Sequence, residues 1–309
     1  MDRRPLLAAA TSVLTFSVGP VLVAASTATA PVFAFWRGWL TILATVAGMA
    51  LLKRGRNVQW PTGRRWRPPI IAGCLNGIAT LLFIEAIKLT SVAGTTLIYQ
   101  INPVLVALWA IPIFGERPGM RFRLWTIVAI MGSIVVILGD SSGPEGNPLG
   151  VAMAGVSVIL YSIQMVITKA GRRTVDTLPM HLIMISSGTV FVTLFALATG
   201  QDFLDMTRAD VLSVAGIVLL PSGLGALLFI WAIRWLPANI PPLINLPIPF
   251  LAGALAWLVL GEAITAAHLI GGVVMLVGIG AALLSASGRR MLAAGSIPKG
   301  PPVGPPPTT

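Results

Sequence analysis

Charged side chains are scarce in this chain. Asp, Glu, Lys and Arg make up 10% of its 309 residues, against about 25% in soluble globular domains. Hydrophobic residues make up 56%, and the mean hydropathy is +0.89. Apolar runs of about 20 residues recur, which is the length that a helix needs to cross a bilayer. These runs are apolar on all sides, so we expect the chain to lie in lipid.

The side chains that usually carry catalysis are also few. Cys74 is the single cysteine, which excludes a disulfide framework and a cysteine-based metal site. The two histidines, His181 and His268, lie far apart, and no H-E-x-x-H, G-x-S-x-G or Walker A motif occurs. We therefore expect neither an enzyme nor an ATP-driven pump, and we expect no metal and no other cofactor.

The apolar runs predict an all-α membrane bundle of ten transmembrane helices. The predicted spans are 6–26, 31–52, 68–90, 93–114, 121–139, 148–169, 179–199, 210–235, 238–260 and 266–286. The Pro-rich segment after the last span is predicted to be a disordered cytoplasmic tail.

Basic residues are concentrated on alternate loops. If the N-terminus is cytoplasmic, 18 of the 21 Lys and Arg residues fall on that side. They are Arg3, Arg4, Lys53, Arg54, Arg56, Arg64, Arg65, Arg67, Arg117, Arg121, Arg123, Lys169, Arg172, Arg173, Arg234, Arg289, Arg290 and Lys299. The opposite side holds Lys88 and Arg208 together with five acidic residues. This asymmetry follows the positive-inside rule. The net charge of +11 therefore orients the protein in its membrane, with both termini cytoplasmic, and it does not indicate nucleic acid.

The chain repeats itself at an offset of 146 residues. LLFIEAIK at 81–88 matches LLFIWAIR at 227–234 at six of eight positions. The same offset pairs Gly77 with Gly223, Pro103 with Pro249, Gly115-Glu116 with Gly261-Glu262, and Gly132 with Gly278. A Gly, a Pro and a Gly-Glu pair in one register indicate an internal duplication. We predict a first five-helix repeat over 1–140, a second over 146–288, and the tail over 289–309.

The number of spans in each copy determines their relative orientation. Because five is odd, the second copy enters the membrane upside down relative to the first. Inverted repeats are the architecture of many secondary transporters, in which substrate binds near the bilayer midplane between the repeats.

These features resemble the EamA-type branch of the drug/metabolite transporter superfamily. The resemblance is carried by ten spans, the stretch TAPVFAFWRGWL that opens the second span, a proline inside the fourth and ninth spans, and the GE pair that closes each of those two. It covers about residues 6–286. The resemblance implies an exporter of amino acids, including aromatic ones, or of other metabolites, in a bacterial inner membrane.

Polar and aromatic residues inside five spans are the candidate substrate ligands. They are Asn76, Thr80, Phe83, Tyr99, Gln100, Asn102, Tyr161, Gln164, Ser222, Phe229 and Asn245. Together they have the make-up of a mostly apolar pocket with a few orienting polar groups. The alternative is that they join helices by hydrogen bonds, and that the amides beside Pro103 repair the bonds which that proline breaks.

Two charged residues within spans are further candidates, as a gate or an ion pair. Arg37 either reaches the outer interface or tethers a helix, or it attracts an anionic group. Glu85 either pairs with Lys88, one turn away, or carries a proton. We expect Arg37 and Glu85 to lie close enough to pair if their helices touch.

We therefore expect a secondary transporter that exports amino acids, possibly aromatic ones, by alternating access. A channel-like or lipid-handling membrane protein is the alternative. The expected partners are a small-molecule substrate and the lipid bilayer, with no nucleic acid. Gly73 and Gly77 form a G-x-x-x-G that could serve a dimer or packing within the bundle. We expect the latter, with a functional monomer.

Overall fold

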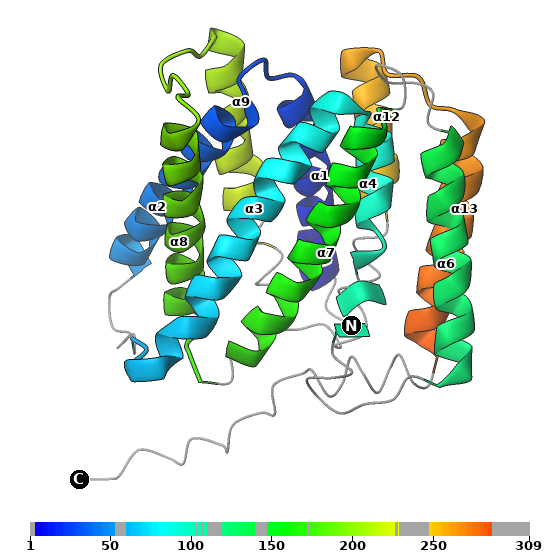
Figure 1. Ribbon diagram of the computed structural model, residues 1–309, viewed down its shortest axis with the longest axis horizontal. Coiled ribbons are helices and arrows are strands. Elements are labelled where there is room, and N and C mark those ends of the chain that lie inside the picture. Colours follow the sequence, from blue (N-terminus) through cyan, green and yellow to red (C-terminus); the bar gives the residue numbers. More distant parts are fainter. Residues whose placement is uncertain are drawn as a thin grey trace.

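The computed structural model describes residues 4–52, 60–102, 104–106, 108–109, 119–139, 147–171, 174–225, 228 and 247–285. Within these residues the chain forms helices and no strands (Figure 1). The elements are α1 (Arg4–Ala24), α2 (Ala30–Leu52), η1 (Gly63–Trp66), α3 (Arg67–Leu89), α4 (Val92–Tyr99), α6 (Met120–Gly139), α7 (Pro148–Gly171), α8 (Thr177–Ala198), α9 (Arg208–Leu219), η2 (Leu220–Gly225), α12 (Ile248–Leu260) and α13 (Ala266–Leu284).

Seven of the predicted spans agree with helices whose ends lie within two residues of the prediction. These helices are α1, α2, α3, α6, α7, α8 and α13. Five helical segments are long and apolar enough to cross a membrane: Ala30–Gly48, Gly63–Leu89, Pro148–Thr168, Leu178–Ala198 and Arg208–Gly225. Large apolar side chains remain exposed on the outside of the bundle, as on α6 and α13, where lipid would cover them.

Three spans with internal prolines differ from the predicted continuous helices, whereas α1 remains continuous through Pro20. The fourth span begins as α4 but leaves α-helical geometry after Tyr99, directly before Pro103. The eighth continues from α9 into η2, a π-helical turn that contains Pro221. In the ninth, α12 begins at Ile248, and the predicted start at 238 lies outside the described residues. Proline lacks the N–H that a helix needs in its interior, which explains the interruptions in the fourth and eighth spans.

The helices pair according to a pseudo-two-fold relation between the halves. With an offset of 146 residues, α1 corresponds to α7, α2 to α8, α3 to α9 with η2, and α6 to α13. The span that begins with α4 corresponds to the span that ends with α12. α3 packs against α7 and α8, and its counterpart packs against α1 and α2. α2 contacts α8, α4 contacts α12, and α6 contacts α13, so these three pairs lie on the axis itself. The α2–α8 and α6–α13 pairs stand at opposite edges of the bundle (Figure 1).

The crossing of α6 with α13 shows the inverted relation at atomic detail. A Cβ built on Gly132 would lie 2.7 Å from the Gly271 carbonyl oxygen, and one on Gly278 would lie 2.8 Å from Ala129 Cα. Gly132 thus contacts α13 at residues that precede Gly278 in the sequence. Likewise, Gly278 contacts α6 at residues that precede Gly132. Because Gly132 and Gly278 are equivalent in the two repeats, the contact is the same when viewed from either helix.

Glycines also bring α3 and α8 together. A Cβ on Gly77 would lie 2.9 Å from the Gly188 carbonyl oxygen, and one on Gly188 would lie 2.7 Å from the Gly73 carbonyl oxygen. The G-x-x-x-G of α3 therefore serves close packing within the bundle, as predicted.

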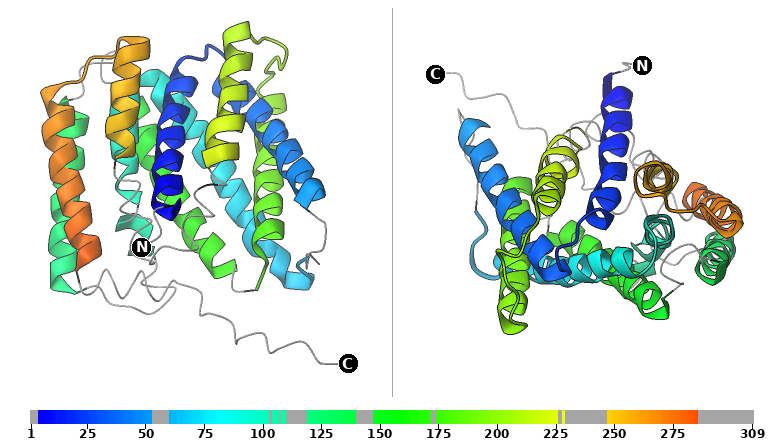
Figure 2. Two further views of the ribbon diagram at one scale, coloured as in Figure 1. Left: turned by 180° about the vertical axis from the view of Figure 1, so that it is seen from behind. Right: turned by 90° about the horizontal axis from the view of Figure 1, so that it is seen from above.

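The two ends of the bundle differ in charge. α1 begins and α13 ends on the same side (Figure 2). That side also holds Arg64, Arg65 and Arg67 at the start of α3, and Arg121 and Arg123 at the start of α6. Three aspartates lie at the opposite side: Asp202 and Asp205 between α8 and α9, and Asp210 in the first turn of α9.

Candidate functional site

Three predicted aromatic residues meet in the middle of the bundle. The ring of Tyr99, at the end of α4, lies 4.6 Å from that of Phe83 on α3, measured between centroids. It lies 5.9 Å from the ring of Tyr161 on α7. All three side chains are partly buried. The structure thus joins one candidate residue from each of three spans in a single aromatic cluster, Phe83–Tyr99–Tyr161.

A buried serine ties this cluster to the backbone. Ser157 on α7 is fully buried, and its hydroxyl donates to the Ala79 carbonyl of α3 at 2.6 Å. The same serine oxygen pairs with the Tyr99 hydroxyl. Because the serine proton goes to Ala79, Tyr99 is the donor. Ser157 was not predicted, although it lies one turn before Tyr161 on the polar face of α7.

Arg37 lies in the same part of the bundle as the aromatic cluster. It lies about two turns into α2 and is partly buried. Its guanidinium is within electrostatic range of the Tyr161 and Tyr99 hydroxyls. The expected closeness of Arg37 and Glu85 stays a prediction, whereas Glu85 is within electrostatic range of Lys88.

Two amides near the cluster keep oxygens without a hydrogen bond. Gln164, one turn beyond Tyr161 on α7, is only 4% exposed. Its Nε2 donates to Thr168 Oγ1 at 2.9 Å, while its Oε1 accepts no hydrogen bond from the described residues. Asn102 donates from Nδ2 to Met165 Sδ at 3.2 Å, and its buried Oδ1 also has no partner there. Two acceptors are therefore available to a donor.

The backbone beside these amides is irregular. The N–H of Gln100 bonds to the Leu97 carbonyl at 2.9 Å, and that of Ile101 bonds to the Ile98 carbonyl at 3.2 Å. These bonds span three residues rather than four, so the helix is wound more tightly there. The break comes immediately before Pro103, which lies outside the described residues.

The other candidate ligands are placed less closely. Asn76 and Thr80 are partly buried on α3, on the helix face that carries Phe83. Gln100 is 9% exposed at the end of α4. Ser222 belongs to η2, which packs against α1. Phe229 and Asn245 lie outside the described residues.

A second polar cluster, at the acidic end of the bundle, was missed by sequence reasoning. Asp210 is 1% exposed. Its Oδ1 accepts from Ser26 Oγ at 2.7 Å and from the N–H groups of Thr27 at 2.7 Å and Ala28 at 3.1 Å. Its Oδ2 accepts from the Thr207 N–H at 2.8 Å, which closes a capping box. One carboxylate thus joins the α1–α2 turn to the start of α9.

Lys88 completes this outer network by donating from Nζ to the Ala28 carbonyl. The signal that could have located Asp210 is the spacing Thr207-x-x-Asp210, which is typical of a helix start.

The two residues of the GE pair that closes the ninth span, Gly261 and Glu262, have different structural roles. Gly261 ends α12 in the left-handed conformation, with φ of 73°, which favours glycine. Glu262 accepts from the Val92 N–H at 3.0 Å, at the first turn of α4. The second repeat thereby caps a helix of the first, and a carboxylate is favourable at a helix N-terminus.

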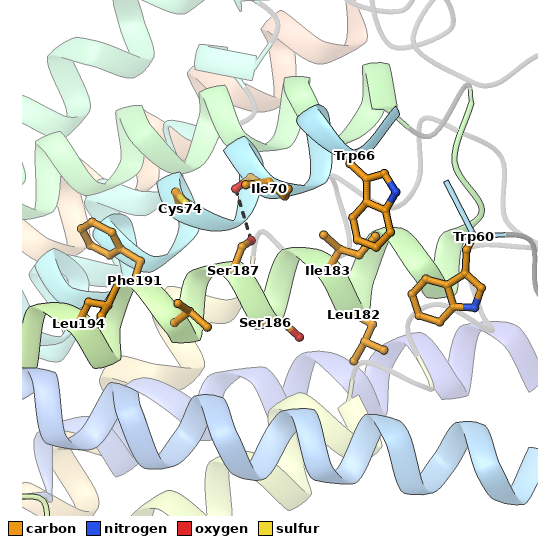
Figure 3. A pocket seen from close by; sticks show the side chains of 11 residues that line it. Trp60, Trp66, Ile70, Cys74, Leu182, Ile183, Ser186, Ser187, Phe191 and Leu194 are labelled. Atoms are coloured by element: carbon orange, nitrogen blue, oxygen red, sulfur yellow. Dashed lines mark hydrogen bonds between the residues drawn. The ribbon is translucent and has the colours of Figure 1, made fainter. Parts of the chain in front are cut away.

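Two cavities are described, and both lie away from the aromatic cluster. The larger, of about 560 Å³, opens between α3 and α8 and is lined by apolar side chains (Figure 3). The smaller, of about 100 Å³, lies beside Asp210. The predicted central cavity stays a prediction, because part of its expected wall, 229–246, lies outside the described residues.

The fold and the buried polar site define a class of protein: multi-pass helical transporters built from two inverted five-helix repeats. The profile of the EamA-like transporter family matches residues 3–138 and again residues 148–284. The chain belongs to the EamA-like transporter family. It is therefore a membrane transport protein and not an enzyme, and its partners are a small-molecule substrate and membrane lipid.

Similar proteins agree with this assignment. The chain is 23% identical to an uncharacterized transporter of Archaeoglobus fulgidus over 217 residues, which are 70% of this chain and 76% of that protein. It is 23% identical to the uncharacterized transporter YdfC of Bacillus subtilis over 197 residues, 62% of each chain. A solved crystal structure superposes with a TM-score of 0.64 at 19% identity, covering 94% of this chain and 99% of the other, and shows the same fold.

Proposed function

We propose that the protein is a secondary transporter that exports amino acids, aromatic ones among them, across the inner membrane by alternating access. The substrate site lies between the halves at the Phe83–Tyr99–Tyr161 cluster. The observation that carries this proposal is the buried Oε1 of Gln164, which accepts no hydrogen bond from the residues that the structure describes. The Oδ1 of Asn102, equally without a donor among those residues, is a second acceptor.

The unpaired amide oxygens suit an ammonium group. Leaving a buried acceptor without a partner costs about 1–3 kcal/mol. An α-ammonium group has donors enough for Gln164 Oε1 and Asn102 Oδ1 together, so a bound amino acid removes that cost. A neutral apolar substrate would not.

Arg37 suits the other end of an amino acid. A guanidinium binds a carboxylate through two parallel N–H···O bonds, which fixes orientation as well as adding energy. Arg37 is within electrostatic range of Tyr161, and Tyr161 is one turn from Gln164 on α7. Arg37 and the Gln164 acceptor thus both lie near one stretch of α7, which a zwitterionic substrate could bridge.

The aromatic cluster suits an apolar side chain. Offset and edge-to-face contacts of aromatic rings contribute about 0.5–1.5 kcal/mol each beyond burial. Phe83 and Tyr99 meet edge to face, at an interplanar angle of 63°, and Tyr161 is tilted by 44° to Tyr99. An aromatic or large aliphatic substrate side chain could pack against these rings.

Irregular helices in both halves support alternating access. Discontinuous helices line the substrate sites of inverted-repeat transporters, and π-helical turns are frequent at functional sites. Here the end of α4 and the η2 turn interrupt helices in opposite halves. We infer that these interruptions are the points at which the two halves rock.

The test compares substrate analogues in variants reconstituted in proteoliposomes. Asn102→Ala and Gln164→Ala should each weaken the apparent affinity for an amino acid about five- to hundredfold. For the analogue that lacks the amino group, the same two changes should have little effect. Arg37→Gln should weaken binding of the amino acid but not of the analogue that lacks the carboxylate. Counterflow against a preloaded substrate should be saturable, which a channel does not show.

Ile159→Ala, on the exposed side of α7, is the matched control and should leave transport unchanged. If the Arg37 and Gln164 variants transport amino acids with normal affinity, or lose every analogue equally, the proposed site is wrong.

A further inference from the structure

The apolar cavity between α3 and α8 is a groove on the outside of the bundle, where lipid would cover it. It has a volume of about 560 Å³, within the range of about 300–1,000 Å³ that is usual for ligand sites. Its wall on α8 includes Leu182, Ser186, Val190 and Leu194, which recur every four residues along one face (Figure 3).

The depth of this groove follows from its two walls. Glycines hold α3 and α8 at backbone contact, as described above, while large side chains such as Ile70 and Phe191 stand up on either side. Of the two serines that line the groove, Ser187 shares its hydroxyl proton between the Met184 carbonyl at 3.2 Å and the Ile70 carbonyl at 3.4 Å. No charged residue lines the groove. Its occupant is therefore apolar along the length of the groove.

The length of the groove matches one leaflet of a bilayer. Leu194 follows Leu182 by 12 helical steps, or about 18 Å at 1.5 Å per step. The hydrocarbon core is about 30 Å thick, so one leaflet contributes about 15 Å. An acyl chain of a single phospholipid could lie along this distance.

One end of the groove is strongly basic. Trp60 and Trp66 close that end, and they are 47% and 39% exposed, as is typical of aromatic residues at a membrane interface. Arg64 and Arg65 of η1 and Arg67 at the start of α3 flank Trp66 in the sequence, and all three are exposed. An anionic headgroup would be held there by three guanidinium groups.

We propose that the α3–α8 groove binds an anionic phospholipid, with one acyl chain between the helices and the phosphate on Arg64, Arg65 and Arg67. The basic end of the bundle places this lipid in the leaflet on the side where α1 begins. The site is independent of the proposed substrate site, so the failure of either proposal leaves the other unaffected.

The test uses phosphatidylglycerol that carries a photoreactive diazirine in one acyl chain. The full chain is reconstituted in nanodiscs of phosphatidylcholine with this probe, irradiated, and digested for mapping by mass spectrometry. Adducts should be concentrated on 70–74 and 182–194. Each basic residue near an anionic headgroup contributes about fivefold to binding. Combined R64Q, R65Q and R67Q changes should therefore reduce the adducts on the order of a hundredfold.

The matched control combines R121Q and R123Q, which remove basic residues at the same end of the bundle and should leave the adducts unchanged. V190W fills the groove without altering the charge and should also abolish the adducts. If adducts spread evenly over the lipid-facing helices, or persist in the triple variant, the surface holds only ordinary bilayer lipid and the proposal fails. If Cys74 of two copies cross-links in place of lipid labelling, the occupant is a second copy, which also overturns it.

Discussion

At the scale of single residues, glycine determines where helices of this protein can touch. Gly132 and Gly278 stand at the α6–α13 crossing, where any side chain would meet partner backbone at less than 3 Å. Backbone cannot move aside as the end of a flexible side chain can. Gly280, two residues further along α13, has nothing within 4 Å of its would-be Cβ. Neighbouring glycines in one helix therefore have different roles.

We predict opposite effects for alanine at these positions. Gly132→Ala and Gly278→Ala should each destabilise the protein by about 1–3 kcal/mol, as overpacking usually does. Gly280→Ala should be neutral or stabilising by up to about 1 kcal/mol, because alanine is the better helix former. Thermal unfolding of the purified variants in detergent measures the stability changes at all three positions. Equal effects at Gly278 and Gly280 would contradict the close crossing.

At the scale of elements, a side chain of the second repeat caps the N-terminus of a helix in the first repeat. Ser91 caps α4 from within the first repeat by accepting from the Gly94 N–H at 2.9 Å. Glu262 adds a second acceptor from the other repeat, at Val92. The start of α4, which leads to the broken segment at Gln100 and Asn102, is therefore held by both halves.

Removing this second cap should loosen α4. Glu262→Ala leaves the Val92 N–H without its acceptor and should cost about 0.5–2 kcal/mol, the usual range for a lost cap. Glu262→Gln keeps an acceptor and should cost less. Thermal unfolding distinguishes the three proteins. The repeat predicts the same ranking at Glu116, whose structure lies outside the described residues. A glutamine variant as unstable as the alanine variant would show that charge, rather than the hydrogen bond, is decisive.

Most of the fold could be predicted from the sequence because lipid imposes a single length and an all-round apolar pattern on each span. The seven helices without a break show this. The Phe83–Tyr99–Tyr161 cluster was also predictable in its members, because each residue lies on a polar face of its span. Its geometry was not, since Ser157 and Ala79 are brought to Tyr99 by contacts between distant segments.

Asp210 is the clearest case of a structural role that could not be predicted from the sequence. Its charge and its place near the end of a span are typical of a loop residue, and we interpreted it as one of the acidic residues of the outer side. In the structure it is buried by the α1–α2 turn, more than 180 residues away in the chain. Hydrogen bonds over such separations leave no periodic pattern in the sequence. Only the local capping box was available as a signal.

At the scale of the whole molecule, the distribution of charge predicts orientation. The end that carries Arg64, Arg65, Arg121 and Arg123 should face the cytoplasm because Lys- and Arg-rich loops are retained there. A reporter that is active only after export should stay inactive when fused after Arg290. The same reporter inserted at Gly200, at the acidic end, should be active. Activity at Arg290 would reverse the assigned orientation.

The equivalence of Gly132 and Gly278 bears on how such a molecule could arise. Their contact is isologous, which means that the two helices use equivalent surfaces to contact each other. A single five-helix chain would already have carried both sides of this contact, and two copies inserted in opposite orientations could have closed it without a connecting peptide. Duplication and fusion of the gene would then have fixed the ratio of the two orientations at one to one. After fusion the copies were free to diverge, as Glu85 and its counterpart Trp231 have done.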